Sequence, residues 1–207
     1  MLVVRATRVS REIIELAPTL ELIIRAGNDT KYIDTNFASS RGIIVANTLG
    51  KSAISVSELV IGMMVASDRK IVANTKSLDS GWWEKGKYSN AKGLFGRKLG
   101  IVGGGHSGRE VIIRAKAFGM HIICFDPILT PEEVDQYGVK VTQDLYELAR
   151  VSDFISVHPA FTSEKEEIIT EEFLSHCKED LVLINTTRSD AVNDQAVLKA
   201  LEANPNM

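Results

Sequence analysis

The stretch that decides the fold runs from Leu99 to Gly108 and reads Leu-Gly-Ile-Val-Gly-Gly-Gly-His-Ser-Gly. Its apolar first half predicts a short strand, and Gly103, Gly105 and Gly108 have the G-x-G-x-x-G spacing that joins a strand to a helix. In that spacing the first glycine permits a tight turn. The second lets backbone N–H groups approach a pyrophosphate, and the third lets the helix pack closely against the strand. Because the start of a helix adds unpaired N–H donors and a partial positive charge, we expect a phosphate-binding turn here.

A carboxylate completes this pattern. Asp126 stands eighteen residues after Gly108, at the end of the next expected strand, His121–Phe125. There a carboxylate can accept hydrogen bonds from both ribose hydroxyls, so strand, glycines, helix, strand and acid in this order predict a dinucleotide-binding domain. Asp126 would also repel a 2′-phosphate, and no arginine follows it, which favours NAD over NADP.

The composition is that of an ordinary globular protein and excludes several function classes. Of the 207 residues, 44% are hydrophobic and 25% are charged, with a formal net charge of −3, so we do not expect nucleic-acid binding. Cys124, Cys177 and four scattered histidines show no metal-ligand spacing, and we expect no metal site. We find no secretory signal, and the most apolar long segment, Val56–Ala66, is too short to span a membrane. These features predict a cytoplasmic protein.

Strands and helices alternate along the chain, as is typical of parallel α/β folds. The expected strands are Leu2–Val4, Leu20–Ile24, Ile43–Ala46, Leu99–Val102, His121–Phe125, Phe154–Val157 and Leu181–Thr186, with Val139–Val141 as a further candidate. From Lys98 onward the alternation predicts a doubly wound parallel sheet of the Rossmann type. Before it, we expect one long helix from Ser55 to about Ser80, followed by a linker at Gly81–Tyr88.

Further stretches resemble the D-isomer-specific 2-hydroxyacid dehydrogenases, in the family's order and over nearly the whole chain. They are Arg25-Ala26-Gly27 leading to Tyr32-Ile33-Asp34, Arg41-Gly42-Ile43 leading to Asn47-Thr48, Ser55–Leu59, Lys98–Gly103, Ala117–Met120, Phe125-Asp126-Pro127, Ser152–His158 and Ile184–Arg188. The resemblance is strongest to the members that act on 3-phosphoglycerate in serine biosynthesis. It implies an NAD-dependent oxidoreductase acting on a small 2-hydroxy or 2-oxo acid, and it leaves open which acid.

The resemblance also implies a domain order. Residues 1–54 would form part of a flavodoxin-like substrate-binding lobe, and residues 55–97 a long dimerisation helix with a linker. Residues 98–207 would form the NAD-binding domain without its last strands. We expect the chain to begin inside the substrate lobe and to end before the family's catalytic glutamate and histidine. The implied partner is a second copy of the chain, bound through the helix that starts near Ser55.

Site residues follow from the same resemblance. Arg188 would be the catalytic arginine, because a guanidinium offers a permanent charge and two parallel donors that can hold the substrate carboxylate and polarise its carbonyl. The loop of Arg25, Ala26, Gly27 and Asn28 would give backbone N–H groups to that carboxylate. The coenzyme would be bound by Asn28, Gly103, Gly105, His106, Ser107, Gly108, Asp126, Pro159, Thr186, Thr187 and Arg188.

Some positions depart from the family pattern and leave two alternatives open. Asp29 replaces a glycine and would repel a substrate carboxylate by about 4 kcal/mol at about 4 Å and an effective dielectric of about 20. Gly104 replaces an apolar residue, which lowers local rigidity. His158 is expected to make a local hydrogen bond rather than to act as the acid, and Arg5 or Arg8 could reach a substrate phosphate. The alternatives are an inactive NAD-binding and dimerisation module, and a truncated fragment.

Overall fold

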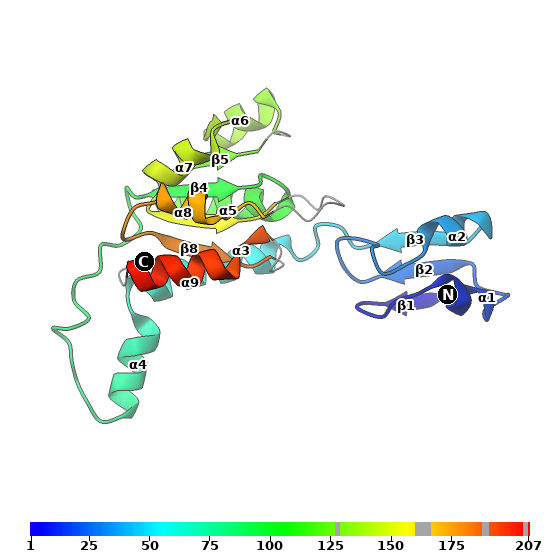
Figure 1. Cartoon of the computed structure of the whole chain (residues 1–207), viewed down its shortest axis with the longest axis horizontal. Coiled ribbons are helices and arrows are strands. Elements are labelled where there is room, and N and C mark those ends of the chain that lie inside the picture. The colour runs from blue at the N-terminus through cyan, green and yellow to red at the C-terminus, as the bar shows by residue number, and fades with distance from the viewer. Residues whose placement is uncertain (127–128, 160–166, 188–190, 205–206) are drawn as a thin grey trace. The chain divides into compact units, whose positions relative to one another are not determined.

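The computed structural model describes residues 1–126, 129–159, 167–187, 191–204 and 207 (Figure 1). These residues fall into two compact units, Met1–Ser52 and Ala53–Met207, and each unit is described by itself. Within the described ranges, every helix is too short or too polar to cross a membrane.

The first unit is a small parallel sheet with the strand order β1-β2-β3. Its elements are β1 (Leu2–Val4), α1 (Arg11–Glu15), β2 (Leu22–Arg25), α2 (Thr35–Ser40) and β3 (Ile44–Asn47). Apolar side chains fill the space between sheet and helices, with Ile14 and Ile23 fully buried. Asp34 begins α2 because its carboxylate accepts the N–H of Phe37 at 2.9 Å. The expected alternation is therefore confirmed in this unit.

The second unit holds a five-stranded parallel sheet with the order β6-β5-β4-β7-β8. Its strands are β4 (Lys98–Val102), β5 (His121–Phe125), β6 (Lys140–Thr142), β7 (Phe154–Val157) and β8 (Val182–Asn185). The chain runs outward from β4 through β5 and β6, and then in the other direction through β7 and β8, so the predicted doubly wound sheet is confirmed. The order reverses between β4 and β7, and ligands of such sheets bind at the carboxyl ends of the strands at that reversal.

Helices cover both faces of this sheet, which explains why its central strands are apolar runs rather than alternating sequences. On one face, α3 (Ala53–Asp68) and α5 (His106–Ala117) pack against Leu99 and Ile101 of β4. On the other face, α7 (Leu145–Val151), α8 (Glu171–Ser175) and α9 (Asp194–Ala203) share a core with Ile155 and Val157 of β7.

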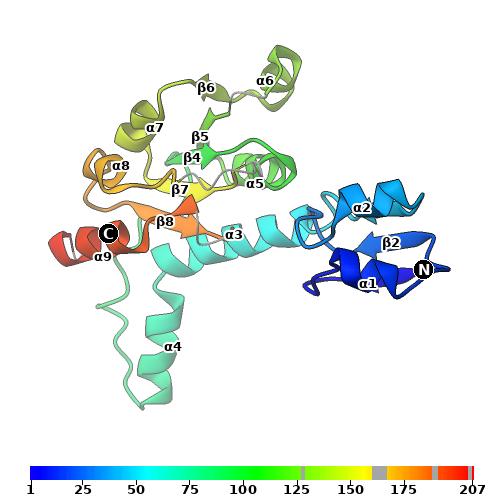
Figure 2. The same ribbon diagram turned by 45° about the vertical axis from the view of Figure 1, so that its right-hand side comes forward.

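Two helices differ from the sequence prediction. The prediction of a single helix from Ser55 to about Ser80 is wrong, because α3 ends at Asp68 and a second helix, α4 (Ile71–Asp79), follows. The two helices are separated at Lys70, whose backbone is left-handed with a φ of 51°. In Figure 2, α4 extends away from the sheet, and none of its residues is buried. The second difference is α6 (Pro131–Tyr137), which the sequence analysis did not predict.

Candidate functional site

The glycine turn lies between β4 and α5, at the reversal of strand order. Gly103 has a φ of 100°, and a Cβ there would collide with the His158 carbonyl. A Cβ on Gly108 would collide with the carbonyl of Gly103, whereas one on Gly105 would meet open space. Gly105 is the N-cap of α5 and gives no side-chain cap to the first helical amides. The turn is therefore closed by backbone on one side and open on the side where the amides of α5 begin.

Asp126 lies beside this turn at the end of β5. Its carboxylate accepts the N–H of Gly104, and the residue is only 8% exposed. A Cβ on Gly104 would lie 2.8 Å from the side chain of Leu129 and 3.1 Å from Asp126 Oδ2. The absence of a side chain at Gly104 thus leaves room for Leu129 and Asp126. This role of Gly104 could not be predicted, because Leu129 approaches it only in the folded chain.

The other predicted coenzyme residues follow β7 and β8. Pro159 is half-buried and comes directly after His158. The Thr186 hydroxyl is buried and has no hydrogen-bond partner in the described part of the chain. The N–H and the hydroxyl of Thr187 both donate to Asn185 Oδ1 at 2.9 Å. Arg188, the predicted catalytic arginine, lies outside the described residues.

His158 makes the local hydrogen bond that the sequence analysis expected. Its Nε2 atom lies 2.7 Å from the Ser156 hydroxyl, and only 6% of the residue is exposed. Burial lowers the pKa of His158 to about 4. The imidazole is therefore neutral at pH 7.

In the first unit, Arg25 and Asp29 neutralise each other. Arg25 Nη1 lies 3.3 Å from Asp29 Oδ2 and donates to the Asp29 carbonyl at 3.1 Å, while Arg25 Nε donates to the Arg5 carbonyl at 3.1 Å. The other carboxylate oxygen of Asp29 accepts the N–H of Lys31 at 3.1 Å. The repulsion expected from Asp29 is thus offset by a cation four residues away.

The rest of this loop is fixed to neighbouring segments. The N–H of Ala26 donates to the Val4 carbonyl at 2.8 Å, and that of Gly27 donates to the Arg25 carbonyl at 2.9 Å. The Asn28 side chain accepts the N–H of Gly50 at 3.2 Å. Within the described residues, the N–H groups of Asn28 and Asp29 have no internal acceptor, and both residues are half-buried, so these two loop amides are left to bind a ligand.

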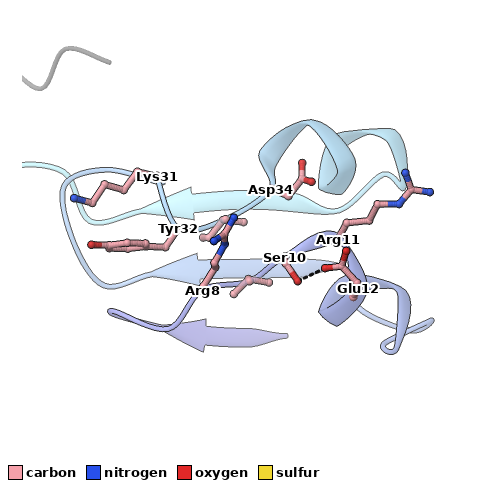
Figure 3. A pocket seen from close by; sticks show the side chains of 9 residues that line it. Arg8, Ser10, Arg11, Glu12, Lys31, Tyr32 and Asp34 are labelled. Atoms are coloured by element: carbon pink, nitrogen blue, oxygen red, sulfur yellow. Dashed lines mark hydrogen bonds between the residues drawn. The ribbon is translucent and has the colours of Figure 1, made fainter. Parts of the chain in front are cut away.

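A hollow of about 470 Å³ opens in the first unit, between the segments that follow β1 and β2 (Figure 3). Arg8, Ser10, Lys31, Tyr32 and Asp34 are among its lining residues. Ser10 donates to Glu12 and Asp34 caps α2, but neither Arg8 nor Lys31 forms an ion pair in the described part of the chain. Lys31 Nζ lies 4.8 Å from the ring centre of Tyr32. Three cations, Arg8, Arg11 and Lys31, line the hollow together with two carboxylates, Glu12 and Asp34, so the lining carries a small positive excess that suits an anionic group.

Comparison with known proteins agrees with this geometry. Residues 61–206 match the family model of the D-isomer specific 2-hydroxyacid dehydrogenase, NAD binding domain. The chain is 38% identical over 203 residues to D-3-phosphoglycerate dehydrogenase of Methanocaldococcus jannaschii, covering 98% of this chain and 38% of that protein. It is 41% identical over 198 residues to hydroxypyruvate reductase of Thermotoga maritima, covering 95% of this chain and 63% of that protein. The chain thus spans less than two thirds of either relative.

Solved structures of dehydrogenases also resemble this chain in fold. A putative D-isomer specific 2-hydroxyacid dehydrogenase from Polaromonas sp. superimposes with a TM-score of 0.85 at 28% identity, covering 98% of this chain and 65% of that one. The NAD complex of formate dehydrogenase from Staphylococcus aureus gives a TM-score of 0.79 at 29% identity, covering 98% and 61%. The chain belongs to the D-isomer-specific 2-hydroxyacid dehydrogenases, and residues 61–206 match their NAD-binding domain.

Proposed function

We propose that this chain binds NAD in its second unit and serves hydride transfer between NAD and a small 2-hydroxy acid, with 3-phosphoglycerate as the first candidate. The observation that carries the proposal is Asp126, held by Gly104 next to an uncapped helix start at the reversal of strand order. A pyrophosphate needs N–H donors and a ribose needs an acceptor, and this arrangement provides both.

Each predicted residue has a defined task in this proposal. The amides of His106 and Ser107 bind the pyrophosphate, Asp126 accepts hydrogen bonds from the ribose hydroxyls, and Pro159, Thr186 and Thr187 contact the remainder of the coenzyme. Arg188 holds the substrate carboxylate and polarises its carbonyl. When bound, NAD supplies the site that accepts the hydride.

The first unit offers matching sites for a substrate with two anionic groups. The free amides of Asn28 and Asp29 suit a carboxylate, and the hollow with Arg8 and Lys31 suits a phosphate. Tyr32 lies between the hollow and the loop that holds these amides. It lines the hollow, and its ring centre is 5.9 Å from the guanidinium of Arg25, which begins the loop. This supports 3-phosphoglycerate over an acid with a single charge.

A second copy of the chain is the proposed partner. Exposed apolar side chains follow one another along α3, α4 and the segment after them: Ile54, Leu59, Met63, Ile71, Val72, Leu78, Trp82 and Trp83. A nine-residue helix without buried residues is marginal in water, so α4 needs a covering surface. A homodimer through α3 and α4 supplies one.

One observation favours the alternative of a coenzyme-binding module without turnover. Proton transfer to the substrate oxygen needs a group that titrates near neutral pH. His158, the histidine that follows β7, is buried, hydrogen-bonded and neutral. His158 does not supply such a group, and in this alternative the chain binds NAD without appreciable oxidation of substrate.

Titration of the chain with NADH, followed by nucleotide fluorescence, tests the coenzyme site, and NADPH is the matched control. We expect NADH to bind at least tenfold more tightly than NADPH, because Asp126 repels a 2′-phosphate. Equal affinity for both, or no binding of NADH, would contradict the proposal. Steady-state NADH formation with D-3-phosphoglycerate then separates the two functions, because turnover above background would exclude the inactive module.

A further inference from the structure

A buried polar pair lies directly behind the glycine turn and makes none of the proposed coenzyme contacts. Ser156 Oγ and His158 Nε2 are 2.7 Å apart, and both residues are buried in the core around β7. Buried polar groups of this kind are costly unless they are paired, so each side chain constrains the other.

The main chain of His158 forms one wall of the turn. Its N–H donates to the Val102 carbonyl at 2.6 Å, which fixes it to the last residue of β4. Its carbonyl occupies the space that a Cβ on Gly103 would need, and the Gly103 carbonyl in turn occupies the space beside Gly108. A shift of the backbone at His158 would therefore pass by direct contact to the first and last glycines of the turn.

We propose that the Ser156–His158 hydrogen bond is a positioning device for the coenzyme turn, which fixes the backbone against which Gly103 rests. Ser156 of β7 holds the imidazole ring of His158, and this keeps the His158 carbonyl in its position against Gly103. This inference rests on the proposed function, because it concerns the affinity of the same NAD site.

Two amide variants at one position isolate the hydrogen bond. The amide of His158→Gln reaches about as far as Nε2 and can still bond to Ser156, whereas the shorter amide of His158→Asn cannot. We expect His158→Asn and Ser156→Ala each to raise the Kd for NADH about tenfold, and His158→Gln to change it less than about threefold. The double variant Ser156→Ala/His158→Asn is expected to be no weaker than either single variant, because both remove the same bond.

A matched control separates positioning from general loss of stability. Ser152 is also fully buried, and its hydroxyl donates to the Leu148 carbonyl at 2.7 Å, but it lies beside Gly100 rather than Gly103. Ser152→Ala should lower the thermal midpoint as much as Ser156→Ala does and leave the Kd for NADH unchanged. If His158→Asn does not fold, Ser156→Ala, which removes a single oxygen, carries the test.

The outcomes are distinct. NADH affinity within twofold of the unaltered chain in both Ser156→Ala and His158→Asn would overturn the inference, and so would an equal loss in His158→Gln and His158→Asn. Failure of the unaltered chain to bind NADH would instead contradict the proposed coenzyme site, and this inference with it.

Discussion

At the scale of single residues, burial without a charged partner sets the titration of His158. Its pKa falls from the ordinary value of about 6.5 to about 4 because the protonated ring cannot be solvated. The unfolded chain takes up this proton near pH 6.5, whereas the folded chain excludes it until about pH 4. The neutral His158 therefore lowers the free energy of unfolding as the pH falls from about 6.5 to about 4, and this loss of stability is complete below about pH 4.

His158→Gln removes this dependence. Between pH 7 and pH 4.5, the free energy of unfolding should fall by about 2 to 3 kcal/mol more for the unaltered chain than for the variant. Urea unfolding at the two pH values measures the difference, and carboxylates that titrate in the same range cancel in the comparison. Equal losses in both proteins would show that His158 is not held neutral by burial.

Two residues near the candidate site show where sequence reasoning at this scale ends. The glycine spacing and Asp126 could be predicted because they belong to a recurring order of strand, glycine turn, helix, strand and acid. The pairing of Asp29 with Arg25 was not predicted, although only four residues separate them, because it depends on the backbone conformation of the turn after β2. The reason for Gly104 was missed for the same kind of cause, since Leu129 comes from beyond the next strand.

At the scale of elements, a partly buried ion pair fixes the end of α3 to the start of the sheet. Arg97 Nη1 lies 3.0 Å from Asp68 Oδ1, with side chains 15% and 5% exposed, and the Arg97 guanidinium lies 4.2 Å from the ring centre of Phe154. Asp68 also accepts the N–H of Gly93 at 2.9 Å. These bonds join the end of α3 to the residues just before β4, and so hold together the two ends of the segment that contains α4.

Removal of Arg97 should be costly because it leaves Asp68 buried without its cation. We expect Arg97→Met to lower the free energy of unfolding by about 3 kcal/mol, measured by urea denaturation at pH 7. Lys199→Met, which breaks the exposed pair with Glu171, is the control and should cost less than about 1 kcal/mol. A loss in Arg97→Met no larger than in the control would mean that the pair does not anchor α3.

The elements themselves were largely predictable, with two exceptions that have physical reasons. Every strand expected around the glycine turn forms, because apolar runs bounded by glycine and polar residues mark buried parallel strands. The break between α3 and α4 falls at Lys70, which is left-handed although it is not a glycine, and no proline stands there to indicate a helix end. The short helix α6 has too few residues to show a clear period.

At the scale of the whole molecule, the proposed homodimer should depend on the apolar side chains of α4. Val72 is 60% exposed, and an acid in its place would carry a charge into the proposed interface. We expect Val72→Asp to shift sedimentation from dimer to monomer, whereas Ala73→Asp, an equally acidic change at an exposed position on the opposite side of α4, keeps the dimer. A monomeric unaltered chain, or a dimeric Val72→Asp variant, would contradict the proposed interface.

The central claim is that the glycine turn binds a dinucleotide whose ribose is held by Asp126. Isothermal titration calorimetry of NADH with the unaltered chain and with Asp126→Ala tests it most directly. The variant loses a charged acceptor for two hydroxyls, so its Kd should be at least about tenfold higher. An identical Kd for both proteins would contradict the account.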